Sequence, residues 1–113
     1  MITGYEFGKI SIDDKDYYKD ISIDWKGNIN VWNRKESHKV QEEDLKKVLD
    51  LKPDVIVIGT GETEMMRVLP ETQELIINND IGLVVKQTQE AISFFNKYLS
   101  ENKKIVGLFH LTC

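Results

Sequence analysis

The period of the hydrophobic pattern changes near residue 40 of the chain. Before that point apolar and polar residues alternate, as they do in half-buried strands. The alternating segments are Tyr5–Ile12, Ile21–Trp25 and Ile29–Val31, and a Lys-Gly-Asn turn between the last two predicts a hairpin. From Gln41 to Leu49 the apolar residues fall at helical spacing. We therefore expect an N-terminal antiparallel β-hairpin region followed by a helix.

Strand and helix patterns alternate in the second half of the chain. The predicted elements are a strand at Val55–Ile58, helical stretches within Glu62–Asn79, a strand at Ile81–Val85, a helix at Gln89–Ser100 and a strand at Lys104–Leu111. Thr88 is expected to cap the last helix, and Pro70 to open the helix before it. This order predicts an α/β fold with a mainly parallel sheet.

Length, composition and charge limit the classes of protein to which the chain can belong. Its 113 residues, 41% hydrophobic and 30% charged, predict one domain over residues 1–113. A net charge of -4 argues against a nucleic-acid partner. No apolar run approaches the ~20 residues of a membrane-spanning helix, and the N-terminus lacks the layout of a secretory signal. A single cysteine excludes an internal disulfide and suits a reducing compartment. We expect a soluble cytoplasmic protein.

Two glycines follow the most apolar strand, in the sequence Gly59-Thr60-Gly61. In open α/β sheets ligands bind beyond the carboxyl ends of the strands, and a glycine loop there can offer backbone N–H groups to an anion. A dinucleotide fingerprint would need a glycine where Glu64 stands, and the Gly-Lys-Ser/Thr of a phosphate-binding loop is absent. We therefore expect no nicotinamide, flavin or other cofactor. A tight turn and a small-ligand site both remain open.

Large amphipathic side chains gather just after the hairpin, at Trp32, Arg34 and His38. Such residues are common in binding hot spots. The alternative is that Trp32 packs across the hairpin and that Arg34 pairs with a nearby carboxylate. His38 and His110 have no Cys or His neighbour at metal-ligand spacing, so no metal site is expected. His110 lies in an apolar strand and is expected to be partly buried and hydrogen-bonded.

The order of short motifs along the chain resembles that of the small Mth-type domain family. The motifs are Tyr5-x-Phe-Gly-x-Ile, Trp32-x-Arg34 with His38, Ile56-Val-Ile-Gly-Thr-Gly61, Thr88-x-x-Ala91 with Asn96, and His110-Leu-Thr-Cys113. Animal members of this family include an adipogenesis-associated protein and, more distantly, an assembly factor of mitochondrial respiratory complex I. The resemblance implies a three-layer fold: a mixed central sheet of about five strands, helices on both faces, and extra N-terminal β structure.

The resemblance also implies that five residues line a common pocket: Arg34, Gly59, Thr60, Gly61 and Thr88. Our leading hypothesis is a non-catalytic binding or assembly domain, with homo-oligomers as one of its forms, that uses the surface near Arg34 and the glycine loop. The alternative is a binder of, or enzyme for, a small anionic metabolite, in which Arg34 and the loop amides hold a carboxylate and His38 acts as acid or base. The alternative predicts a concave pocket where Arg34, the loop and Thr88 converge.

Overall fold

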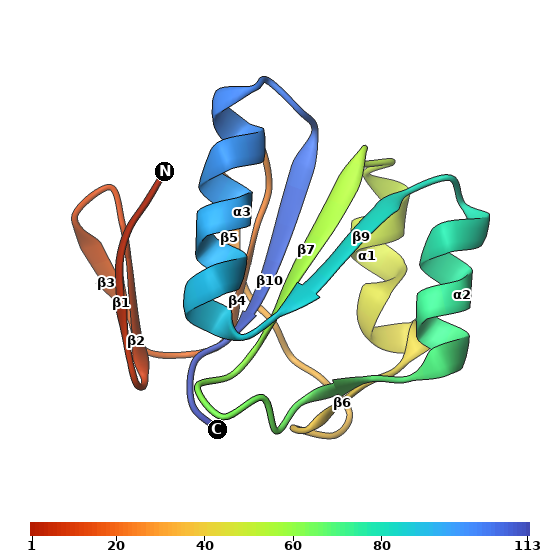
Figure 1. Cartoon of the computed structure of the whole chain (residues 1–113), viewed down its shortest axis with the longest axis horizontal. Helices are drawn as coiled ribbons and strands as arrows, with labels where there is room; N and C mark the ends of the chain where they lie inside the picture. The colour runs from red at the N-terminus through yellow and green to blue at the C-terminus, as the bar shows by residue number, and fades with distance from the viewer.

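A five-stranded mixed sheet forms the centre of the molecule in the computed structural model, which describes residues 1–113 (Figure 1). The strand order is β5-β4-β10-β7-β9. The strands are β4 (Ile21–Ile23), β5 (Ile29–Val31), β7 (Val55–Thr60), β9 (Gly82–Lys86) and β10 (Ile105–His110). β10, β7 and β9 run parallel, whereas β4 is antiparallel to both β10 and β5. The predicted mixed sheet is thus confirmed.

Helices cover both faces of this sheet, as the resemblance implied. One face packs against α3 (Thr88–Ser100), and the other against η1 (Glu42–Leu45), α1 (Lys46–Asp50) and α2 (Pro70–Asn78). Alternate residues of β10 serve the two cores: Phe109 meets Phe95 of α3, while Leu108 lies in the cluster that contains Ile76 of α2. Because β7 and β10 are buried on both faces, their sequences are almost continuously apolar.

The N-terminal sheet contains three antiparallel strands, β1 (Ile2–Glu6), β2 (Lys9–Ile12) and β3 (Lys15–Tyr17), and packs beside α3 (Figure 1). The side chain of Asn96 fixes β1 by bonding both the N–H and the C=O of Ile2. The prediction of a single strand over Tyr5–Ile12 is wrong, since β1 ends at Glu6 and β2 begins at Lys9. A turn at Phe7-Gly8 divides it, and Gly8 has a φ of +81°, which glycine adopts without strain.

Three further details refine the sequence-based elements. β7 runs through Gly59 and ends at Thr60, so the strand does not stop at the first glycine. Gln87, not Thr88, caps α3, because its side chain accepts from the N–H of Glu90. Pro70 does open α2. A short parallel pair of strands, β6 (Lys39–Val40) and β8 (Arg67–Val68), completes the fold. None of the helices has the length and hydrophobicity needed to span a membrane.

The carboxyl ends of four strands meet at one edge of the central sheet. Because β5 is antiparallel to β4, and β4 to β10, β5 runs in the same direction as β10, β7 and β9. The amino end of β4 lies there too. This end, where the chain's C-terminus is found at the bottom of Figure 1, we call the carboxyl edge. It is where open α/β sheets place their ligand sites.

Candidate functional site at the carboxyl edge

Three charged or titratable side chains lie together inside the carboxyl edge. Asp20 precedes β4, Arg34 follows β5, and His110 ends β10. Oδ2 of Asp20 lies 2.7 Å from Nη2 of Arg34 and 2.7 Å from Nδ1 of His110. The side chains of Arg34 and His110 are only 4% and 5% exposed. The strand topology therefore brings residues 90 positions apart in sequence into one buried polar cluster.

Asp20 is the shared acceptor of this cluster. Oδ1 accepts from the backbone N–H of Leu111 at 2.9 Å, and Oδ2 accepts from both Arg34 and His110. Burial alone would raise the pKa of the Asp20 carboxyl, but the hydrogen bonds from His110, Arg34 and Leu111 together hold it below its ordinary value. Asp20 is therefore ionised at neutral pH.

Arg34 uses only part of its guanidinium within the molecule. Nη2 donates to Asp20 and, at 2.7 Å, to the backbone carbonyl of Ser37, while the group lies 4.4 Å above the ring of Trp32. This pairing confirms the predicted carboxylate partner of Arg34. Its Nε and Nη1 are buried and have no hydrogen-bond partner. Since buried polar atoms are nearly always paired, these two atoms need an explanation in any account of the site.

His110 is oriented by the same carboxylate. Nδ1 carries the hydrogen, because the ionised oxygen that it faces can only accept. Nε2 is buried without a partner. The ring of His38, an exposed residue, meets that of His110 edge-on, with centroids 5.5 Å apart. Because the carboxylate of Asp20 holds Nδ1 of His110, the opposite ring nitrogen, Nε2, can donate or accept a proton. The Asp20–His110 pair therefore has the chemistry of a positioned acid or base.

Thr88 joins three segments at this edge. Its hydroxyl donates to the carbonyl of His110 at 2.6 Å and accepts from the N–H of Gly61 at 2.8 Å. Thr88 also packs directly on Gly59, where a Cβ atom would come within 3.0 Å of the Thr88 Cα. Gly59 is therefore explained by the close approach of α3 to the sheet. Thr60 completes this layer through a bond from its hydroxyl to the carbonyl of Lys86.

The amides of the glycine loop are largely occupied by the chain itself. The N–H of Gly61 bonds to Thr88, that of Glu62 bonds to the carbonyl of Thr112 at 2.7 Å, and that of Met65 bonds to the carbonyl of Cys113 at 2.9 Å. Gly61 has a φ of +104°, and a Cβ atom there would collide with the backbone of Cys113. Both features match a tight turn that requires glycine.

Tyr5 ties the N-terminal sheet to this region. Its hydroxyl lies 3.1 Å from the carbonyl of Leu111 and 3.2 Å from a carboxylate oxygen of Glu62. Burial, reinforced by the negative charge of Glu62, raises the pKa of Tyr5 to about 12. Tyr5 therefore remains a neutral hydrogen-bond donor at physiological pH.

The residues expected from sequence form two groups at the carboxyl edge. Arg34 and His38 lie beside the ring of His110, whereas Gly59, Thr60, Gly61 and Thr88 lie beside its backbone. His110 connects the groups. Asp20 was missed because a lone aspartate before a short strand carries no local signal, and His110 had been expected to have a structural role only.

No principal hollow of the surface joins Arg34, the glycine loop and Thr88. A hollow of about 440 Å³ reaches the carboxyl edge at Thr60 and is otherwise lined by residues 64, 66–70 and 85. Another hollow, of about 500 Å³, lies beside β5 and α1. No three His, Cys, Asp or Glu side chains are grouped so that they could hold a metal ion.

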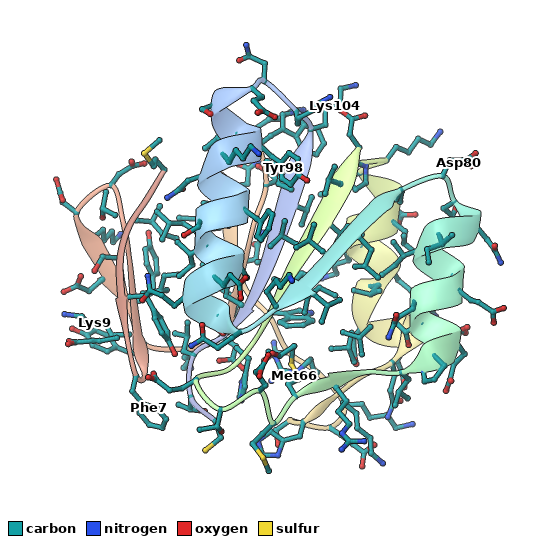
Figure 2. All side chains as sticks on the ribbon, viewed as in Figure 1. Phe7, Lys9, Met66, Asp80, Tyr98 and Lys104 are labelled. Carbon is teal, nitrogen blue, oxygen red and sulfur yellow. The ribbon has the colours of Figure 1, made fainter.

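A layer that is exposed apart from the buried Met66 and the half-buried Thr112 lies over the buried cluster. It comprises residues 36–39, 62–67 and 112–113, which we call the edge surface. The N–H of Arg67 bonds to the carbonyl of His38 at 2.8 Å, and the amide of Met65 to Cys113, so the three segments are fixed to one another. Figure 2 shows Met66 beneath this end of the sheet, with Asp80 and Lys104 at the opposite end.

The fold is that of a small α/β domain found in several solved structures. A conserved hypothetical protein, PH1505 from Pyrococcus horikoshii OT3, is 32% identical with a TM-score of 0.91, covering 100% of this chain and 99% of that one. A protein named MT938 is 24% identical with a TM-score of 0.85, covering 100% and 98%. A Bordetella pertussis protein described as a Mth938-like domain is 17% identical with a TM-score of 0.80, covering 98% and 85%.

Residues 2–110 match the family described as "Protein of unknown function (DUF498/DUF598)". The chain belongs to this family. The resemblance to Mth-type domains inferred from its motifs is thereby confirmed.

Proposed function

We propose that this chain is a non-catalytic binding domain that contacts a protein partner with the edge surface. The observation that carries the proposal is that buried polar side chains bond to the backbone of the chain itself. Asp20 accepts from the N–H of Leu111, Arg34 donates to the carbonyl of Ser37, and Thr88 donates to the carbonyl of His110. They thereby hold the strand ends and loops beneath and beside the edge surface in fixed positions. Fixed loops reduce the ordering cost of association.

The outer side of the edge surface has the composition of a contact area. Met65 is 53% exposed, and Arg67 and His38 are exposed as well. Backbone hydrogen bonds already fix Met65 to Cys113 and Arg67 to His38. Methionine and arginine are enriched at the centres of protein interfaces. A partner could therefore bury Met65 without rearranging the domain.

A double variant that places negative charges on the edge surface tests this function. Met65→Glu with Arg67→Glu should abolish capture of a partner when tagged protein is purified from its own cells and analysed by quantitative mass spectrometry. The matched control is Ile77→Glu with Lys103→Glu, which changes one exposed apolar and one exposed basic residue outside the edge surface. The control should retain the partner. Equal capture by both variants, or no specific capture by the wild type, would contradict the proposal.

A second candidate function is the binding of a small anion by Arg34. It is favoured by the buried Nε and Nη1 of Arg34 and the buried Nε2 of His110, none of which has a partner. A small carboxylate could satisfy the arginine donors, which are suited to such ligands. Differential scanning fluorimetry with a panel of small carboxylates and inorganic anions tests it, since a ligand at about 100 times its Kd adds about 2.7 kcal/mol.

The two candidates are separated by their variants. An anion that stabilises the wild type, but neither Arg34→Lys nor Arg34→Gln, would support the second function. The same anion should still stabilise the Met65→Glu, Arg67→Glu protein, because those side chains do not contact the buried guanidinium through any hydrogen bond or ion pair. If no anion stabilises the wild-type protein, only the protein-binding proposal remains.

A further inference from the structure

β9 is the outermost strand of the central sheet on the side opposite to β5. The N–H of Gly82 donates to the carbonyl of Asp54 at 3.0 Å, so the backbone groups of Gly82 face β7. Because this direction alternates along a strand, Leu83 and Val85 turn their N–H and C=O groups away from the sheet. No hydrogen bond outside the strand ladders uses these groups. Two residues of β9 can therefore pair with a further strand.

β9 has few of the features that protect natural edge strands. Such strands are commonly very short, or carry charged residues, proline or a bulge. β9 has five residues without a proline, and its register with β7 is regular throughout, so it contains no bulge. Its one charged residue, Lys86, stands at the end of the strand, after the run Leu83-Val84-Val85. The middle of this edge is therefore apolar.

Half-buried apolar side chains border the β9 edge. Leu83, Val84 and Val85 are half-buried, whereas almost every residue of β7 and β10 is buried. On the α3 face, Phe94 and Tyr98 are also half-buried, and their rings stack with centroids 6.4 Å apart. Figure 2 shows Tyr98 on the side of α3 turned away from the N-terminal sheet, and Phe94 lies one helical turn earlier on the same side. A second chain at this edge would cover these side chains.

The two ends of β9 carry opposite charges. Asp80 lies just before the strand, and Lys86 is its last residue. Both side chains are exposed, and neither forms an ion pair within the molecule. An antiparallel strand of the same sequence would bring its lysine toward Asp80 and its aspartate toward Lys86. The β9 edge is thus complementary to itself, as a two-fold symmetric contact requires.

We propose that this protein forms a two-fold symmetric dimer through β9, which joins the central sheets of two copies into one continuous sheet. With Val84 opposite its counterpart on the two-fold axis, Leu83 of each copy exchanges both backbone hydrogen bonds with Val85 of the other. Lys86 of each copy then lies diagonally across from Asp80 of the other. A Lys–Asp contact therefore occurs twice in the dimer.

A second copy fits this edge better than an unrelated strand does. It brings outward backbone groups in matching register, the same apolar border and the opposite end charges. A two-fold axis perpendicular to the sheet keeps α3 of both copies on one face and α2 of both on the other, so the half-buried rings of Phe94 and Tyr98 are on the same face in both copies. These residues are not part of the edge surface, so the inference does not rest on the function proposed above.

Sedimentation equilibrium over roughly 1 μM to 1 mM protein tests the dimer. The 13.1 kDa chain should pass from monomer to dimer as its concentration rises. In hydrogen exchange followed by NMR, the amides of Leu83 and Val85 should exchange at least about tenfold more slowly in the dimer than in the monomer. A protein that stays monomeric, or a dimer in which these two amides remain unprotected, would overturn the proposal.

A charge exchange tests the antiparallel register. Lys86→Glu alone should raise the Kd of the dimer at least about tenfold, because repulsion replaces attraction at two places. Asp80→Lys together with Lys86→Glu should restore the Kd to within about threefold of the wild-type value. The control, Lys19→Glu, changes an exposed lysine that also lacks an ion pair, and should dimerise normally.

The single variant decides the outcome if the double variant fails to fold, since Asp80 has a φ of +59°, which lysine adopts less readily than aspartate. Cooperative urea unfolding identifies the variants that are folded. If Lys86→Glu dimerises as the wild type does, or if the folded double variant stays as weak as the single one, the β9 contact is refuted.

Discussion

The carboxyl edge and the hollow between β5 and α1, which we call the β5 groove, are two parts of the molecule whose polar groups are used differently. At the carboxyl edge, Asp20 and Thr88 bond to the chain's own side chains and backbone. At the β5 groove, the outward backbone groups of Ile29 and Val31 and the charge of Lys46 have no partner within the molecule. The first region has the properties of a scaffold, whereas the second leaves these groups unpaired. Substitutions at the carboxyl edge should therefore lower the free energy of unfolding more than substitutions at the β5 groove.

The largest effect is expected from Asp20→Ala. Removing the carboxylate leaves the buried guanidinium of Arg34 without its counter-charge and the amide of Leu111 without its acceptor. Breaking a buried ion pair in this way costs about 3–5 kcal/mol. Urea unfolding at pH 7 measures the loss. Glu74→Ala, on α2, is the control and should change stability by less than about 0.5 kcal/mol. Similar effects of the two substitutions would contradict the scaffold role.

Thr88→Val should have the next largest effect. The shape of the side chain is kept, but the N–H of Gly61 and the carbonyl of His110 lose their buried partner. Leaving two such groups unpaired costs about 2–4 kcal/mol. Thr63→Val is the matched substitution, because the hydroxyl of Thr63 bonds the carbonyl of Cys113 at an exposed position. Thermal or urea unfolding should show a much smaller loss of stability for Thr63→Val than for Thr88→Val. Equal losses would argue against Thr88 as the residue that connects the segments of the carboxyl edge.

The contribution of Asp20 should also depend on pH. Its folded-state pKa lies below its unfolded value of about 3.9, so its stabilisation is complete above that pH and is lost as the pH falls through the folded pKa. Asp20→Asn should cost about 1–3 kcal/mol at pH 7. In unfolding experiments this difference should shrink as the pH falls from about 4 toward 2. A difference that stays constant over that range would show that ionised Asp20 is not the source of the stability.

The smallest effect is expected at the β5 groove. Lys46→Glu with Lys47→Glu should change the free energy of unfolding by less than about 0.5 kcal/mol, because neither lysine has an ion pair to lose. Urea unfolding beside the Asp20→Ala protein gives the comparison directly. A loss above about 2 kcal/mol would mean that these lysines belong to the scaffold after all.

The parts of the fold that depend on local pattern could be predicted from sequence. The apolar runs of β7 and β10, the amphipathic stripe of α3 and the opening of α2 at Pro70 are each specified within a few neighbouring residues. The division of Tyr5–Ile12 was missed because a two-residue turn at Phe7-Gly8 barely interrupts the alternation.

The candidate site was predictable only in part. Arg34 and the glycine loop stand at strand ends, where the direction of parallel strands places them at one edge. Asp20 has no such signal, because its role depends on β4 running antiparallel to β10, a pairing between segments about ninety residues apart in sequence. Similarly, the side-chain bonds of Thr88 to Gly61 and His110 depend on how α3 sits over the sheet.

Native-state hydrogen exchange measured by NMR tests the contrast between the two regions most directly. The amides of Gly61 and Leu111, which bond to the side chains of Thr88 and Asp20, should exchange only through unfolding close to global. The amides of Ile29 and Val31 should exchange far faster, although they lie in a strand of the same sheet. If Gly61 and Leu111 exchange as quickly as Ile29 and Val31, the carboxyl edge is not a closed scaffold and the account fails.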